Sequence, residues 1–185
     1  MSPARVLVTG ATGVVGRLLL PQLLARGHRV TAVGRTAEKR AALNALGADA
    51  IALDILDADG ARRSMAGHDA VINLATHMPS SLFKMLLPWA WRKNDRVRRD
   101  RVRRDGSATL AQAALMAGVS RFIQESFAPV YGDGGEQWID EQWPQRPAPY
   151  NRTVLDAEKS ASRFTIGGGS DAAGRTAIRG DGVRP

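Results

Sequence analysis

Three glycines spaced three residues apart follow the first apolar run of the chain. Residues 6–8 are Val-Leu-Val, and Thr-Gly-Ala-Thr-Gly-Val-Val-Gly follows as residues 9–16. Glycines so placed allow a tight turn, close approach of the backbone to an anion, and close packing of a helix on a strand. A pyrophosphate then binds the N–H groups and the positive dipole at the start of that helix. Three glycines are more than a plain strand–helix corner needs. We therefore expect a dinucleotide site at Gly10, Thr12, Gly13, Val14, Val15 and Gly16.

Arg35 is a second residue whose type and position could contribute to dinucleotide binding. It follows the predicted strand at residues 29–33, within Val33-Gly34-Arg35-Thr36. In a dinucleotide-binding domain this point faces the adenosine ribose, where an acid binds the 2′-hydroxyl of NAD and an arginine suits the 2′-phosphate of NADP. The segment has no acid, so we expect NADP to be preferred over NAD. The alternative is that Arg35 is an ordinary solvated side chain.

Strand-like and helix-like segments alternate regularly along the chain and must position these residues. Short apolar runs predict strands at residues 6–8, 29–33, 50–53, 70–75 and 121–125. Between and after them, helices are expected at residues 13–26, 37–46, 57–66, 94–117 and 150–163. This alternation predicts βαβ units and a parallel sheet covered on both faces. The expected fold is α/β, a doubly wound, Rossmann-like domain with an incomplete carboxy-terminal part.

Length and composition indicate one domain. The chain has 185 residues, of which 44% are hydrophobic, and it has no cysteine, so disulfides, thiolate metal sites and cysteine catalysis are excluded. Lacking a membrane-length apolar run and a secretory segment, it is expected to be cytoplasmic. Residues 165–185 hold six glycines and no continuous β-branched run. We therefore expect the NAD(P)-binding domain at residues 1–164 and a mostly disordered tail at residues 165–185.

The positive charge is concentrated in one block. Of the net charge of +8, residues 91–105 contribute +5, and they include Arg-Val-Arg-Arg-Asp twice, at residues 96–100 and 101–105. Five residues turn a helix by about 140°, so the two copies face different directions. A solvated helix surface is the expectation, and nucleic-acid binding is the less favoured alternative.

The remaining sequence features are an apolar run and three scattered histidines. The apolar run at residues 82–91 is expected to cover the nicotinamide and substrate rather than a membrane surface. The three histidines lack metal-ligand spacing, so no metal site is expected, although His77 could touch substrate.

These motifs together resemble a known superfamily. Gly-x-x-Gly-x-x-Gly after the first strand, Asp54-Ile55 after the third and Asn73-Leu74-Ala75 after the fourth are similar to short-chain dehydrogenases/reductases. The resemblance is closer to their extended branch, the NAD-dependent epimerase/dehydratase family, and covers about residues 5–163. It implies that Asp54 and Ile55 flank the adenine, while the segment after the fourth strand lines the ribose and nicotinamide half. Without the family, Asp54 reads as a turn residue.

The resemblance also implies a catalytic serine after the fifth strand, a tyrosine at the start of the next helix and a lysine four residues later. Ser126 and Tyr150 occupy the first two places, but Val154 stands where the lysine belongs. Lys159 is nine residues beyond Tyr150, about 13.5 Å along the helix and on its opposite side, so it cannot substitute.

If active, the protein is expected to transfer hydride at a carbonyl or sugar-like alcohol, with Ser126 orienting the oxygen and Tyr150 carrying the proton. The missing lysine keeps a non-catalytic dinucleotide-binding sensor open as an alternative. Extended family members continue into a smaller substrate domain, so a truncated paralogue is a further alternative. A homodimer is a further expectation, because long helices of this superfamily often form dimer interfaces.

Overall fold

One sheet of five parallel strands forms the centre of the molecule. The computed structural model describes residues 2–76, 100–126, 130–140, 142–148 and 152–167. The strands lie in the order β3-β2-β1-β4-β5 and comprise β1 (Arg5–Thr9), β2 (Arg29–Val33), β3 (Asp49–Ile51), β4 (Ala70–Asn73) and β5 (Arg121–Gln124). The chain builds outward from β1 to β3 and then returns to place β4 on the other side of β1. The predicted doubly wound α/β fold is confirmed.

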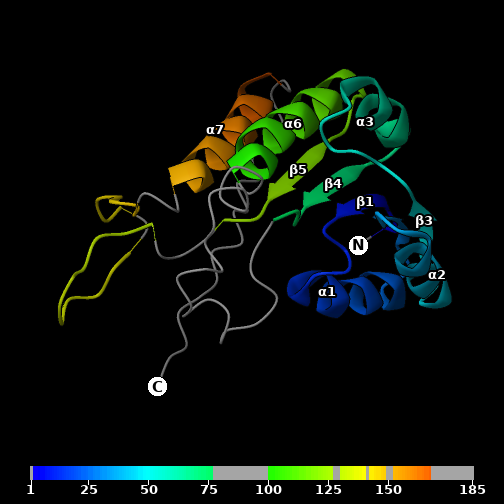
Figure 1. Cartoon of the computed structure of the whole chain (residues 1–185), viewed down its shortest axis with the longest axis horizontal. Coiled ribbons are helices and arrows are strands. Elements are labelled where there is room, and N and C mark those ends of the chain that lie inside the picture. The colour runs from blue at the N-terminus through cyan, green and yellow to red at the C-terminus, as the bar shows by residue number, and fades with distance from the viewer. Residues whose placement is uncertain (1, 77–99, 127–129, 141, 149–151, 168–185) are drawn as a thin grey trace.

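Helices cover both faces of the sheet (Figure 1). On one face lie α1 (Val14–Ala25) and α2 (Ala37–Ala45); on the other lie α3 (Ala58–Met65), α6 (Ser107–Met116) and α7 (Arg152–Gly167). β1 shows why both layers are needed, since Val6 and Val8 pack toward α1 and α2 while Leu7 packs toward the other layer. An apolar strand buried on both faces is typical of a parallel sheet. No helix in the described part of the chain is both long enough and apolar enough to span a membrane.

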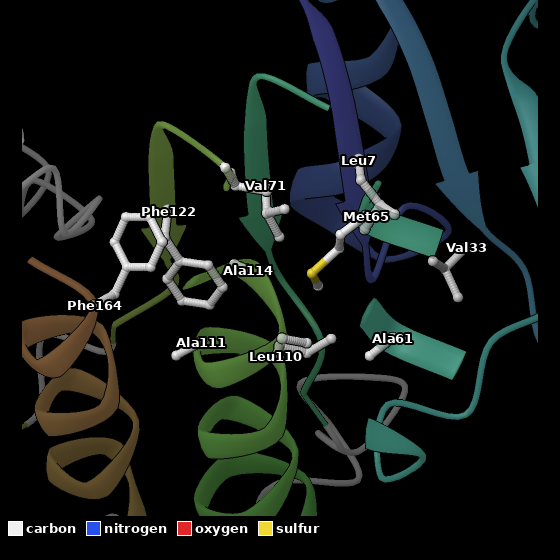
Figure 2. Packing of buried hydrophobic residues seen from close by; sticks show 12 residues of the cluster. Leu7, Val33, Ala61, Met65, Val71, Leu110, Ala111, Ala114, Phe122 and Phe164 are labelled. Carbon is white, nitrogen blue, oxygen red and sulfur yellow. The ribbon is translucent and has the colours of Figure 1, made fainter. Parts of the chain in front are cut away.

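The core on the second face is built around small residues of α6. Ala111 and Ala114, together with Leu110, lie between the side chains of α3 and the aromatic pair of β5 and α7 (Figure 2). The pair is Phe122 and Phe164, whose ring centroids are 5.6 Å apart. Short side chains at these positions let α6 pack closely against the sheet.

The start of α6 departs from the sequence prediction. Residues 102–106 form a π-helical turn, η2 (Val102–Gly106), in place of the regular helix expected over residues 94–117, of which residues 94–99 lie outside the described part. A π-turn accommodates an extra residue and often marks a functional site. In this turn Arg103 is buried, with 5% of its surface exposed, while Arg101 and Arg104 are exposed. The interpretation of this block as solvated surface is therefore wrong for Arg103.

Element boundaries also differ in places. β3 and β4 end two residues earlier than expected, because the chain turns at the carboxyl edge of the sheet. α7 runs to Gly167, past the predicted domain boundary at residue 164, and residues 168–185 lie outside the described part. Tyr150, His77 and the segment at residues 82–91 also lie outside it.

Candidate dinucleotide site at the carboxyl edge of the sheet

The glycine turn joins β1 to α1 at the point where the order of strands reverses. Gly10 has a φ of +67°, and a Cβ there would lie 2.2 Å from the Leu74 carbonyl oxygen. A Cβ on Gly16 would lie 2.5 Å from the Ala11 carbonyl oxygen. Both glycines are therefore required by backbone packing, Gly10 against the end of β4 and Gly16 against the turn. The resulting loop lies at the topological switch point, where open α/β sheets bind ligands.

The start of α1 is open to an anion. Gly13 is its N-cap and supplies no side-chain hydrogen bond, and the first turn has no acidic residue. A Cβ on Gly13 would meet only the Gly10 carbonyl oxygen, at 3.1 Å. Val14 is 82% exposed, so the end of the helix is not covered by the described residues. An unblocked helix start of this kind fits a pyrophosphate.

Arg17 is a residue at this end of α1 that the sequence reasoning missed. Its Nε donates a hydrogen bond to the carbonyl oxygen of Thr12, 3.0 Å away, which ties the side chain to the glycine turn. The guanidinium group thus adds positive charge beside the open N–H groups. The sequence signal that could have identified Arg17 is a basic residue directly after the third glycine.

The end of β2 holds two arginines. Arg35 is exposed, and Arg40, half-buried, donates through Nη1 to the carbonyl oxygen of Gly34 at 3.1 Å. Thr36 caps α2 by accepting from the backbone N–H of Lys39 at 3.3 Å. Arg40 was not anticipated, although it lies one helical turn after the Thr36 cap. Positive charge at this end suits a phosphate on the adenosine ribose.

Asp54 and Ile55 both have structural roles after β3. The Asp54 carboxylate accepts a hydrogen bond from the backbone N–H of Leu56 at 3.0 Å, which forms a local turn. Ile55 packs on the core, and a Cβ on Gly106 of η2 would lie 2.6 Å from its Cδ1. The side chain of Asp54 is exposed, and its predicted place beside an adenine ring stays a prediction.

A buried polar network joins the ends of β1, β4 and β5. The Asn73 Oδ1 accepts from the Thr9 hydroxyl at 2.5 Å and from the backbone N–H of Ala75 at 3.1 Å. Its Nδ2 donates to Gln124 Oε1 at 2.8 Å and to the Ser107 hydroxyl at 3.2 Å. Asn73 is fully buried, so this amide aligns three strand ends with α6. The segment Asn73-Leu74-Ala75 lies at the expected edge, but the Asn73 side chain is engaged within the protein.

Ser126 lies at the same edge, beyond β5. It is buried, and its hydroxyl donates to Oε1 of Glu158 on α7. The sequence reasoning missed Glu158, because a contact between residues 32 positions apart leaves no local pattern. Val154, at the expected lysine position, is buried in α7 and Lys159 is exposed. The structure thus brings Ser126 to the edge of the sheet without a lysine from α7, and Tyr150 lies outside the described residues.

Glu125 is a further residue at this edge that the sequence did not single out. Its backbone N–H donates to the carbonyl oxygen of Asn73 at 2.9 Å, which places it beside the end of β4. Burial raises the pKa of the Glu125 carboxyl, and the charge of Arg103 opposes that increase. In the described part of the chain, no group of three acidic or histidine side chains could hold a metal ion.

Comparisons with known proteins agree with this geometry. A family model described as NAD(P)H-binding matches residues 10–166. A 3-diazoavenalumate denitrifying reductase from a Streptomyces species is 34% identical over 142 residues, covering 76% of this chain and 43% of the reductase. A UDP-glucose 4-epimerase from Mycolicibacterium smegmatis is 32% identical over 155 residues, covering 79% of this chain and 46% of the epimerase. The chain spans less than half the length of the curated relatives it matches.

Solved structures give the same result. A short-chain dehydrogenase/reductase superfamily protein from Agrobacterium tumefaciens, with NAD bound, superposes with a TM-score of 0.68 at 28% identity, covering 86% of this chain and 44% of that one. A dTDP-glucose 4,6-dehydratase from Streptomyces venezuelae, also with NAD bound, has a TM-score of 0.71 at 25% identity, covering 88% of this chain and 52% of that one.

Proposed function

We propose that this chain uses a bound dinucleotide for hydride transfer on a small molecule, because it belongs to the NAD(P)H-binding family, within the epimerase/dehydratase branch of the short-chain dehydrogenases/reductases. Its cofactor is NAD(P). The resemblance found in the sequence is thereby confirmed. The proposed reaction is reduction of a carbonyl or oxidation of a sugar-like alcohol. A cytoplasmic location and a homodimer remain predictions from the sequence.

The observation that carries this proposal is the open start of α1 at the switch point between β1 and β4. The backbone N–H groups of Val14, Val15 and Gly16 would hold the pyrophosphate, with Arg17 adding charge. Arg35 would bind a 2′-phosphate at the end of β2, so we propose a preference for NADP. Residues at the ends of β4 and β5 would then hold the other half of the dinucleotide. When bound, the reduced cofactor supplies a hydride.

The residues after β5 would face the reacting group. Because the Ser126 hydroxyl donates its proton to Glu158, its oxygen would remain able to accept a hydrogen bond from a substrate alcohol. The role of Tyr150 as proton carrier rests on the resemblance. The buried Val154 supports a second candidate function, a dinucleotide-binding sensor without turnover.

Calorimetric titration with NADPH tests cofactor binding at the glycine turn. The variant Gly13→Asp places a carboxylate where the pyrophosphate would lie, and Gln22→Glu makes the same charge change at an exposed position of α1. We expect saturable binding by the wild-type chain and by Gln22→Glu, and loss of binding in Gly13→Asp. Equal binding by both variants would contradict the proposed site.

Oxidation of NADPH in the presence of small aldehydes and ketones then separates an enzyme from a sensor. Turnover by a chain that binds NADPH supports hydride transfer. Binding without turnover of any carbonyl probe supports the sensor.

A further inference from the structure

Glu125 directly follows β5, at the end of the sheet where the reactive half of the dinucleotide would lie. It is anchored by its backbone N–H to Asn73. Its side chain is half-buried, and no hydrogen bond to its carboxyl group is found among the described residues. Neighbouring strands are about 4.8 Å apart, so β5 lies about 10 Å from β1. A partly desolvated carboxyl group beside a specific charged residue is a candidate for a functional site.

The order of the strands places Glu125 on the nicotinamide side. The adenosine end of the dinucleotide belongs at β2, where Arg35 lies, and the pyrophosphate belongs at the start of α1 beside β1. The remaining half must continue past β1 in the same direction. It therefore reaches the ends of β4 and β5, where Glu125 follows the last strand.

Arg103 is the charged group that acts on Glu125. It lies in η2, and the π-turn directs it inward while its neighbours Arg101 and Arg104 face solvent. Its charge favours the ionised form of Glu125, whereas burial favours the neutral form. On the α7 side, Glu158 is engaged by Ser126, and Asp100 accepts from Thr153 at 3.4 Å.

Ser126 and the side chains of α7 at Val154 and Lys159 offer no alternative proton donor at the end of β5. The Ser126 proton is directed to Glu158, and an ordinary serine hydroxyl has no second proton to give. Val154 cannot carry a proton, and Lys159 is exposed on α7. Glu125 is therefore the carboxyl group at this edge that remains able to exchange a proton with a bound substrate.

We propose that the Glu125 carboxyl, rather than Tyr150, exchanges the substrate proton during hydride transfer, because Val154 occupies the place of the lysine that would assist Tyr150, and that Arg103 stabilises the Glu125 carboxylate. This inference rests on the proposed function. In reduction, the carbonyl carbon receives the hydride that NAD(P)H supplies, and a C–H bond forms. The C=O π electrons move to oxygen, which takes the proton from Glu125. The products are the alcohol, NAD(P)⁺ and the Glu125 carboxylate; oxidation of an alcohol reverses each step.

Comparing NADP⁺ with NADPH tests this role without a known substrate. The nicotinamide ring is positive only in NADP⁺, so a carboxyl beside it ionises more easily in that complex. Binding of NADP⁺ should then release protons that NADPH binding does not, and NADP⁺ affinity relative to NADPH should rise with pH. Each unit of pKa difference changes that ratio by about tenfold. The 2′-phosphate titrates in both complexes and cancels.

The measurement is calorimetry in buffers of different ionisation enthalpy, on the wild type, Glu125→Gln, Tyr150→Phe and the control Glu136→Gln, an exposed acid. We expect the extra proton release to disappear only in Glu125→Gln. Retention of the release in Glu125→Gln, or its loss in Tyr150→Phe alone, would overturn the proposal. Failure of the wild type to bind either cofactor would instead contradict the proposed function.

A second measurement covers the case in which Glu125→Gln does not fold. The wild-type chain, labelled with ¹³C at glutamate carboxyl groups, is titrated by NMR in both complexes. A glutamate carboxyl whose pKa is raised with NADPH and lower with NADP⁺ supports the proposal. Glutamate signals that titrate identically in the two complexes would refute it.

Discussion

Replacing Asn73 with alanine tests whether one buried amide holds the edge of the sheet together. The change removes buried hydrogen bonds to Thr9, Ser107 and Gln124 and a partly buried one to Ala75. The hydroxyl groups of Thr9 and Ser107 can rotate toward other hydrogen-bond partners. The Ala75 N–H and the Gln124 Oε1 lose the Asn73 amide as their partner. A buried group that loses its partner costs about 1–3 kcal/mol, so the expected loss of unfolding free energy is about 2–6 kcal/mol. That is a large share of a typical domain's stability.

Asn44→Ala is the matched control. Asn44 Oδ1 also accepts one backbone hydrogen bond, from Ala50 at 2.9 Å, but Asn44 is exposed and water can replace it. The control should lose about 1 kcal/mol. Urea unfolding, followed by circular dichroism, measures the free energy of unfolding of both variants. The urea midpoints are compared for variants whose free energy of unfolding depends equally steeply on urea concentration.

A double-mutant cycle tests whether the bonds act as a network. Thr9→Val removes a single hydrogen bond to Asn73. Its cost should be smaller in the Asn73→Ala background than in the wild type, by about 0.5–3 kcal/mol. Equal loss of stability in Asn73→Ala and Asn44→Ala, or strict additivity in the cycle, would refute the reasoning.

The remaining predictions concern the cofactor site and the core. Gly10→Ala should weaken NADPH binding and stability together, because its Cβ would lie 2.2 Å from a backbone oxygen at positive φ. Arg35→Ala should weaken NADPH binding about tenfold or more with little effect on NADH, since a charged hydrogen bond contributes about 1.5–3 kcal/mol; Arg63→Ala is the exposed control. Leu110→Ala, at a fully buried position, should cost about 2–5 kcal/mol in urea unfolding. Burial lowers the pKa of His68 below 6.5, so the folded state binds a proton more weakly than the unfolded chain. Stability should therefore be full above about pH 6.5 and fall as pH drops through the lowered folded pKa, and His68→Gln should flatten that dependence.

Each of these predictions has a contradicting result. A stable Gly10→Ala chain with unchanged affinity would mean that the turn can move away from Leu74. Parallel loss of NADPH and NADH affinity in Arg35→Ala would exclude a phosphate-specific role. A loss well below 2 kcal/mol in Leu110→Ala would mean that the core repacks, and an unchanged pH dependence in His68→Gln would assign it to other groups.

The parts of the fold that local sequence determines were predictable. The glycine spacing required a turn between β1 and α1, and the apolar runs located all five strands of the described sheet. Strand ends were less accurate at residues 52–53 and 74–75, because apolar residues continue into the turns that line the edge. There, tertiary contacts rather than residue type decide where pairing stops.

The contacts at the site depended on residues far apart in sequence. The hydrogen bond from Ser126 to Glu158 forms because α7 packs beside β5, and no periodic pattern encodes that pairing. The inward direction of Arg103 comes from a π-turn, which shifts the register of the helix by a residue and moves one arginine of a basic block into the interior. Regular helical geometry predicts a solvated surface for the same residues.

Mapping backbone amide shifts on addition of NADPH is the most direct test of the central claim. An isotope-labelled chain is titrated and each shifted amide is assigned. We expect large shifts at residues 13–17 of the glycine turn and at Glu125 and Ser126, with small shifts at His28 and His68 at the opposite ends of the strands. Saturable binding with shifts confined to those opposite ends, or no shifts in a folded chain, would contradict the claim.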